Sequence, residues 1–124
     1  MKHYLTVVVG GQTQQTILLN QLYNFSKGRL TMGRMETCDI VLPYSTVSRS
    51  HAYLDIKGDA IDIVDMGSLN KLRINGVVYD RIRLINGMKI VIGADETAKG
   101  AVIIYYNAVK DNQEIDSPAQ FSYP

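Results

Sequence analysis

The sequence contains little of several residue types that mark particular classes of protein. Only one of its 124 residues is a cysteine, Cys38, so the chain cannot form an internal disulfide. It has no tryptophan and only three prolines. No apolar run approaches the ~18 residues that a membrane-spanning helix needs, and the apolar stretch near the N-terminus is too short for a signal peptide. These absences predict a cytoplasmic protein with no segment inserted into a membrane.

An excess of charge of one sign is also missing. Thirteen Lys and Arg residues face twelve Asp and Glu residues, which gives a net charge of +1. A dedicated nucleic-acid binder carries a strongly basic face, so this balance argues against a nucleic-acid partner. Hydrophobic residues make up 46% of the chain and charged residues 20%, as in folded proteins. We therefore expect one folded domain in which any bound anion is held by a local group of residues.

Few residues are suited to metal or cofactor binding. His3, His51 and Cys38 are the only imidazole and thiol side chains, and they lack the spacing of a metal site. Three aspartates within residues 59–65 recur at every third position, whereas a calcium-binding loop places its oxygen ligands at every second position. Neither glycine-rich phosphate-binding pattern occurs. The sequence predicts no metal and no cofactor.

Ser48 and His51 are the one pair of side chains that suggests nucleophilic catalysis, with Asp39 or Asp65 as the acid. In an extended chain a separation of three residues places two side chains about 10 Å apart on opposite faces, so only a tight turn could join them. The Gly-x-Ser-x-Gly motif and a second base are both missing. We therefore predict that the chain is not an enzyme.

Short apolar or alternating runs separated by turn residues fill the chain up to Tyr106. Three turn dipeptides each lie between two such runs, which predicts three β-hairpins. No segment of ten residues shows a helical stripe. The pattern predicts about ten short strands in a sandwich or barrel. The three dipeptides are Gly10-Gly11, Gly58-Asp59 and Asn75-Gly76.

The last part of the chain has a different composition. From Lys110 onward the sequence has no period and holds two of the three prolines. We therefore expect a sandwich domain at residues 1–108, followed at residues 109–124 by a tail or a linker to a further region.

Five short motifs lie in order along the middle of the chain. In this order and spacing they resemble the forkhead-associated (FHA) domain, and the resemblance covers about residues 3–106. It implies an all-β sandwich of about eleven mostly antiparallel strands, whose loops at one end bind a threonine-phosphorylated protein or peptide that a Ser/Thr kinase has modified. The motifs are Gly33-Arg34, Asp39-Ile40-Val41-Leu42, Ser48-Arg49-Ser50-His51-Ala52, Asp65-Met66-Gly67-Ser68-Leu69-Asn70 and Ile74-Asn75-Gly76.

The resemblance also implies roles for single residues. Arg34 would make the charged contact with the phosphate, and Ser48 and Arg49 would donate hydrogen bonds to it. Asn70 would bond the main chain of the bound peptide. Such donors suit a phosphothreonine, which carries about −1.5 to −2 charges at pH 7. The residues with a supporting structural role would be Gly33, His51, Asn75 and Gly76.

Simpler interpretations stay open for the same residues. Arg34 could pair with Glu36 or Asp39 on the surface, because exposed ion pairs are common and weak. Ser48 could close a turn by bonding its own backbone, and Asn70 could be a turn asparagine in the left-handed conformation.

The sequence departs from the family pattern in two places. Leu69 stands where the family has threonine, and Lys71-Leu72 replaces Gly-Thr. Leucine cannot donate, so one hydrogen bond to the phosphate is lost, although Ser68 or the positively charged Lys71 could replace it. Two functions therefore remain: phosphothreonine-dependent binding, or an FHA-fold scaffold that binds its partner independently of phosphorylation, for example as the N-terminal part of a larger secretion ATPase.

Overall fold

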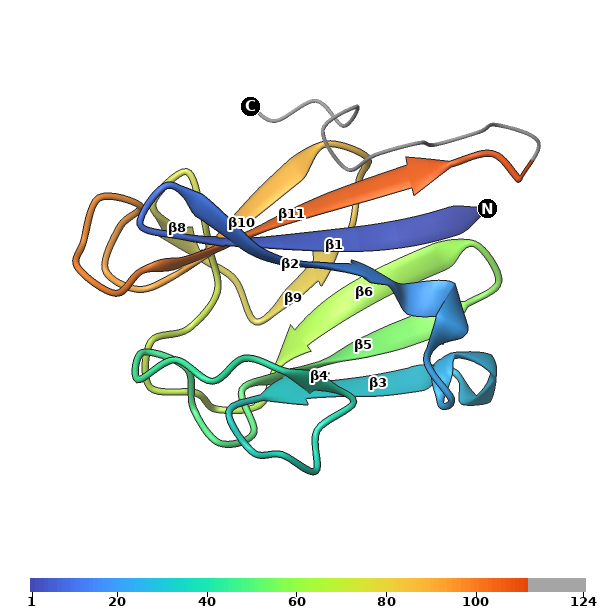
Figure 1. The fold of residues 1–124 in the computed structure, drawn as a ribbon, viewed down its shortest axis with the longest axis horizontal. Helices are drawn as coiled ribbons and strands as arrows, with labels where there is room; N and C mark the ends of the chain where they lie inside the picture. The colour runs from blue at the N-terminus through green and yellow to red at the C-terminus, as the bar shows by residue number, and fades with distance from the viewer. Residues whose placement is uncertain (112–124) are drawn as a thin grey trace.

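The computed structural model describes residues 1–111, which form the two packed β-sheets of Figure 1. Within these residues the helical elements are two 3-10 turns, η1 (Leu19–Gln21) and η2 (Phe25–Lys27), and neither could cross a membrane. The predicted β-sandwich of about eleven strands is confirmed. The strands are β1 (Lys2–Val9), β2 (Gln12–Leu18), β3 (Arg29–Gly33), β4 (Ile40–Val41), β5 (Ala52–Lys57), β6 (Ala60–Asp65), β7 (Arg73–Ile74), β8 (Val77–Val78), β9 (Arg81–Arg83), β10 (Met88–Ile92) and β11 (Val102–Val109).

The strands divide into a six-stranded and a five-stranded sheet. The first has the order β2-β1-β11-β10-β7-β8, and the second has the order β4-β3-β5-β6-β9. Neighbours are antiparallel, apart from the parallel pair β3 and β4. Strand β1 lies between β2 and β11 and pairs with β11 from Lys2 opposite Val109 to Val9 opposite Val102. The predicted tail at residues 109–124 lies mostly outside the described residues.

The three predicted hairpins are present as β1–β2, β5–β6 and β7–β8. In the last of these, Asn75 and Gly76 have φ values of 50° and 79°, the left-handed conformation that a tight hairpin turn requires. The similar dipeptide Asn86-Gly87 does not close a hairpin, because β9 pairs with β6 and β10 pairs with β11. Instead the Asn86 side-chain oxygen accepts a hydrogen bond from the backbone N–H of Ala108 at 2.9 Å.

The core lies between the sheets and follows the two-residue period of the strands. In β5, β6 and β9, for example, alternate side chains are buried, and most of the buried ones are apolar. Burial of one such side chain contributes about 1.5–3 kcal/mol, which makes this layer the main source of stability. The core includes Leu5, Val7 and Ile104 from one sheet and Leu30, Leu54 and Ile63 from the other.

Candidate functional site

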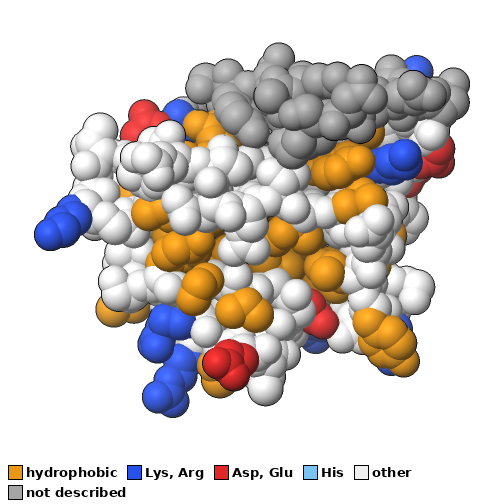
Figure 2. All heavy atoms as spheres, viewed as in Figure 1, with side chains coloured by type: hydrophobic (Ala, Val, Ile, Leu, Met, Phe, Trp, Pro, Cys, Tyr) orange, Lys and Arg blue, Asp and Glu red, His pale blue; other side chains and the backbone are white. Residues whose placement is uncertain are grey.

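Three loops at one end of the sandwich carry the predicted binding residues. Arg34 follows β3, Ser48 and Arg49 precede β5, and Asn70 and Lys71 lie between β6 and β7. In Figure 1 these loops lie at the left, where the arrowheads of β3 and β6 point. Because β5 pairs antiparallel with both β3 and β6, the ends of β3 and β6 lie beside the start of β5. Lys and Arg side chains project at the lower left of Figure 2, over this end of the molecule.

The first two loops are joined backbone to backbone. The N–H of Arg34 donates to the carbonyl of Ser48 at 3.0 Å, and the N–H of Met35 donates to the carbonyl of Arg49 at 3.3 Å. This approach requires glycine at position 33, because a Cβ on Gly33 would lie 2.1 Å from the carbonyl oxygen of Arg49. Arg34 and Ser48 are therefore held side by side.

Arg34 does not form the surface ion pair of the simpler interpretation. Its Nε donates to the carbonyl of Val47 at 3.1 Å. The carboxylate of Asp39 instead accepts hydrogen bonds from Thr31, from the backbone N–H at 2.8 Å and from the hydroxyl at 3.0 Å. Within residues 1–111, Arg34 forms no ion pair with Glu36 or with Asp39.

Arg49 also lacks an acidic partner in the described part of the chain. On the outer face of the five-stranded sheet, by contrast, Arg81 and Arg83 both pair with Asp62, and the Nε of Arg81 lies 2.9 Å from its carboxylate. The charges of that face are thus compensated locally. The loop end holds two arginines, Arg34 and Arg49, whose charge no acidic side chain of residues 1–111 compensates.

His51 connects the second and third loops from inside the protein. Its side chain is fully buried, Nδ1 accepts the backbone N–H of Ser48 at 3.0 Å, and Nε2 lies 2.9 Å from the carbonyl oxygen of Lys71. A backbone N–H can only donate, so Nδ1 carries no proton and Nε2 donates. The imidazole is therefore neutral. A tight turn does bring Ser48 and His51 together, but the bond uses the serine backbone and not its hydroxyl.

The hydroxyl of Ser48 bonds to the third loop. It accepts the backbone N–H of Leu69 at 3.1 Å, which is a contact across 21 residues and not the local turn bond of the simpler interpretation. A hydroxyl has one hydrogen to donate in addition to its acceptor sites. The hydrogen of Ser48 therefore remains available to a ligand.

Ser68 cannot replace the donor that is lost at Leu69. It is 3% exposed, its hydroxyl donates to the carboxylate of Asp65, and the same oxygen accepts the backbone N–H of Lys71 at 3.0 Å. Lys71 has a φ of 64°, so it adopts the left-handed conformation that glycine accepts without strain. The sequence left Ser68 and Lys71 open as replacement donors. Of these two, only Lys71 has a side chain without hydrogen bonds to the rest of residues 1–111.

Asn70 is anchored on one side only. Its side-chain Nδ2 donates to the carbonyl of Thr46 at 2.7 Å. Within residues 1–111 its side-chain oxygen has no hydrogen-bond partner. It can therefore accept a hydrogen bond from a backbone N–H of a ligand.

Two residues that shape these loops are absent from the sequence-based prediction of the site. Thr46 holds the side chain of Asn70, and Asp65 accepts the backbone N–H groups of Gly67 at 3.0 Å and Ser68 at 3.1 Å. The order Asp-x-Gly-Ser is typical of a turn that an aspartate closes, so it could have identified Asp65. Thr46 carries no such signal, because its contact with Asn70 is set by the fold.

The buried histidines give the protein a pH-dependent stability. Burial lowers the pKa of His51 and of His3, whose Nδ1 lies 2.6 Å from the hydroxyl of Tyr106. In the unfolded chain both would take up a proton near their ordinary pKa of about 6.5. Their contribution is therefore complete above about pH 7 and is lost progressively as the pH falls below 6.5.

We expect urea denaturation to give a lower free energy of unfolding at pH 5 than at pH 7.5. The His3→Gln variant, which cannot be protonated, should show a smaller difference between the two pH values. The carboxylates with a lowered pKa, such as Asp39 and Asp62, act only at more acidic pH and do not affect this comparison. Equal stability at both pH values would contradict the expectation.

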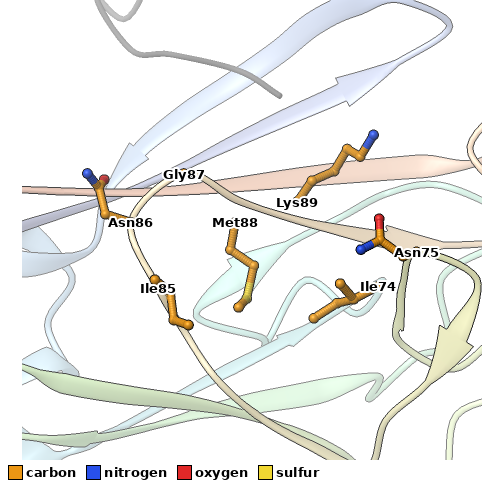
Figure 3. Close-up of a pocket in the computed structure, with 7 residues that line it drawn as sticks. All are labelled: Ile74, Asn75, Ile85, Asn86, Gly87, Met88 and Lys89. Carbon is orange, nitrogen blue, oxygen red and sulfur yellow. The ribbon is translucent and has the colours of Figure 1, made fainter.

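A hollow of about 350 Å³ lies beside the β7–β8 turn, and no predicted phosphate-binding residue lines it. Figure 3 shows Ile74, Ile85 and Met88 pointing into it. The titratable side chain of its lining is Lys89, which is paired with Glu96 at 2.6 Å. Among residues 1–111 no group of three or more His, Cys, Asp or Glu side chains could hold a metal ion.

Comparisons with known proteins bear on the family and the fold of this chain. The glycogen accumulation regulator GarA of Mycolicibacterium smegmatis is 41% identical over 61 residues, which cover 49% of this chain and 39% of that protein. The match thus spans about two fifths of that relative. The Slr1951 protein of Synechocystis sp. has a similar structure, with 26% identity, a TM-score of 0.68 and coverage of 87% of this chain and 99% of that one.

A second solved structure, an FHA domain described in a structural and functional analysis of phosphothreonine-dependent FHA domain interactions, has a TM-score of 0.66 and 20% identity. It covers 86% of this chain and 98% of that chain. The family model of the FHA domain matches residues 30–93, which is more than half of this sequence. The chain therefore belongs to the FHA domain family, as its five sequence motifs predicted.

Proposed function

We propose that this chain is a phosphothreonine-dependent interaction module that binds a phosphorylated segment of a partner protein at its loop end. One observation carries the proposal. Arg34 and Arg49 have no acidic partner within residues 1–111, and they flank Ser48, whose hydroxyl hydrogen is uncommitted. Two cations beside a hydroxyl donor form a site for an anion with several acceptor oxygens.

A phosphothreonine fits this site in charge and in hydrogen bonding. Its −1.5 to −2 charges at about pH 7 would interact with Arg34 and Arg49, and Lys71 would add positive charge nearby. Each charge-assisted hydrogen bond contributes about 1.5–3 kcal/mol. Ordering of the peptide offsets part of this gain, so we expect a dissociation constant in the micromolar range, about −8 kcal/mol. The free side-chain oxygen of Asn70 would accept an N–H of the ligand backbone.

The named relatives support a regulatory role and not a catalytic one. One relative is named a regulator of glycogen accumulation, and one similar structure was analysed for phosphothreonine-dependent interactions. By analogy we propose that this chain is not an enzyme and that it acts in the cytoplasm. Its partner would be a protein that a Ser/Thr kinase has phosphorylated.

A second function is favoured by one specific observation. Leu69 replaces a hydroxyl donor, and the hydroxyl of neighbouring Ser68 is bonded to Asp65. With one donor fewer, the loops could bind a partner through contacts that do not need the phosphate. The alternative is therefore an interaction scaffold that keeps the FHA fold without phosphate dependence.

Titration of the purified chain with a phosphothreonine peptide library separates the two functions. A selected peptide should bind with micromolar affinity when phosphorylated and should not bind measurably after phosphatase treatment. Arg34→Ala should weaken binding by about 10- to 100-fold, which corresponds to about 1.4–2.7 kcal/mol. Arg81→Ala, which removes an arginine from the outer sheet face, is the matched control and should leave affinity unchanged. Binding that survives both dephosphorylation and Arg34→Ala would support the scaffold instead.

A further inference from the structure

Leu69 is an exposed apolar side chain in the middle of the candidate site. It is 84% exposed, more than any other large hydrophobic residue in the described part of the chain. Its backbone N–H donates to the hydroxyl oxygen of Ser48 at 3.1 Å, the same oxygen that would face the phosphate. The residues on either side are fixed, because Ser68 is buried and Asn70 is bonded to Thr46. Leu69 is thus presented at a defined place and not on a loose loop.

A second exposed apolar side chain lies in the first loop, next to Arg34. Met35 is 39% exposed, follows Arg34 directly, and donates its N–H to the carbonyl of Arg49 at 3.3 Å. Single exposed apolar residues are normal on protein surfaces. Here, however, the loops that carry the predicted phosphate donors also carry the exposed side chains of Leu69 and Met35. A ligand residue next to the phosphate could contact them.

We propose that Leu69 makes this site select a phosphothreonine that has a large apolar residue next to it in the bound segment. This inference rests on the proposed function. A leucine at this position gives up a hydrogen bond to the phosphate, and it recovers stabilisation only when a ligand removes its side chain from water. A charged or small neighbour in the ligand would leave Leu69 exposed in the complex.

The geometry limits which ligand positions can contact Leu69. Its backbone nitrogen is 3.1 Å from the hydroxyl oxygen of Ser48, so its side chain starts beside the place where the phosphate would bind. Successive residues of an extended peptide advance by about 3.4 Å. The contact is therefore limited to positions within about two residues of the phosphothreonine.

The test is a phosphothreonine peptide library that varies the two positions on each side of the modified residue. The unmodified protein should bind peptides with Leu, Ile, Met or Phe at one of these positions at least five-fold more tightly than peptides with Ser or Asp there. Leu69→Thr should remove this preference and keep phosphate-dependent binding, because threonine restores a donor. Ile85→Thr makes a similar change at an isoleucine that is 63% exposed in the hollow of Figure 3, and it should keep the preference.

The outcomes distinguish this inference from the function on which it rests. Phosphate-dependent binding without an apolar preference would overturn the inference and leave the function standing. A preference that persists in Leu69→Thr would also overturn it, because another residue would then be responsible. Absence of any phosphate-dependent binding would contradict both. Urea midpoints of both variants equal to that of the unmodified protein would show that neither result comes from unfolding.

Discussion

Replacement of His51 by alanine is expected to lower the free energy of unfolding by about 3–5 kcal/mol and to abolish ligand binding at the loop end. The imidazole is fully buried, and it bonds the N–H of Ser48 and the carbonyl of Lys71. Alanine would leave both backbone groups without a partner and would add a cavity. Urea denaturation at pH 7.5 measures the stability, and titration with a phosphothreonine peptide measures the binding.

His3→Ala is the control for the loss of a buried histidine as such. His3 lies in strand β1 and not in the binding loops. It is 1% exposed, and its Nδ1 lies 2.6 Å from the hydroxyl oxygen of Tyr106. It should destabilise the protein and leave the affinity of the folded fraction unchanged. A His51→Ala variant that loses less than about 1 kcal/mol and still binds its ligand would show that the imidazole does not hold the loops.

Gly33→Ala is expected to cost about 3 kcal/mol of stability, at the upper end of overpacking effects. The added Cβ would lie 2.1 Å from the carbonyl oxygen of Arg49, 2.9 Å from its carbonyl carbon and 3.1 Å from the backbone nitrogen of His51. These are backbone atoms, so no side chain can rotate to make room. The loops would have to separate, which would also displace Arg34. Urea denaturation at pH 7.5 measures this loss.

Gly67→Ala is the matched control, because it tests backbone conformation without crowding. A Cβ at Gly67 would meet nothing within 4 Å, but its φ is +71°. The expected cost is about 1 kcal/mol, which is the strain of a side chain in the left-handed region. Equal losses in the two variants would show that the close approach at Gly33 does not matter.

Local signals account for most of what the sequence predicted correctly about the fold. Turn dipeptides such as Asn75-Gly76 predict hairpins because the required positive φ values depend on those residues alone. Which strands pair within each sheet, by contrast, depends on contacts between residues that are far apart in the chain. Asn86-Gly87 illustrates this limit, since the same dipeptide connects the two sheets and bonds to Ala108.

The candidate site shows the same division. The motifs bring Arg34, Ser48 and Asn70 to one end of the sandwich, and the structure places all three on neighbouring loops. The hydrogen-bond partners could not be read from the motifs. Whether Ser68 could replace the lost donor depends on how the chain turns after Asp65, and that turn directs the serine hydroxyl into the protein. The roles of these residues in ligand binding stay predictions.

The pairing of β1 with β11 has a consequence for the order in which the protein folds. Lys2 pairs with Val109, so β1 cannot form this pairing until β11, the last strand of the described sandwich, has been synthesised. Until then β1 has an unpaired edge, which is a site for association with other chains. Pairing of such distant strands makes folding slow, on the order of milliseconds to seconds. Residues 30–93, which match the family, contain neither strand, so the matched segment completes its six-stranded sheet only with strands that lie outside it.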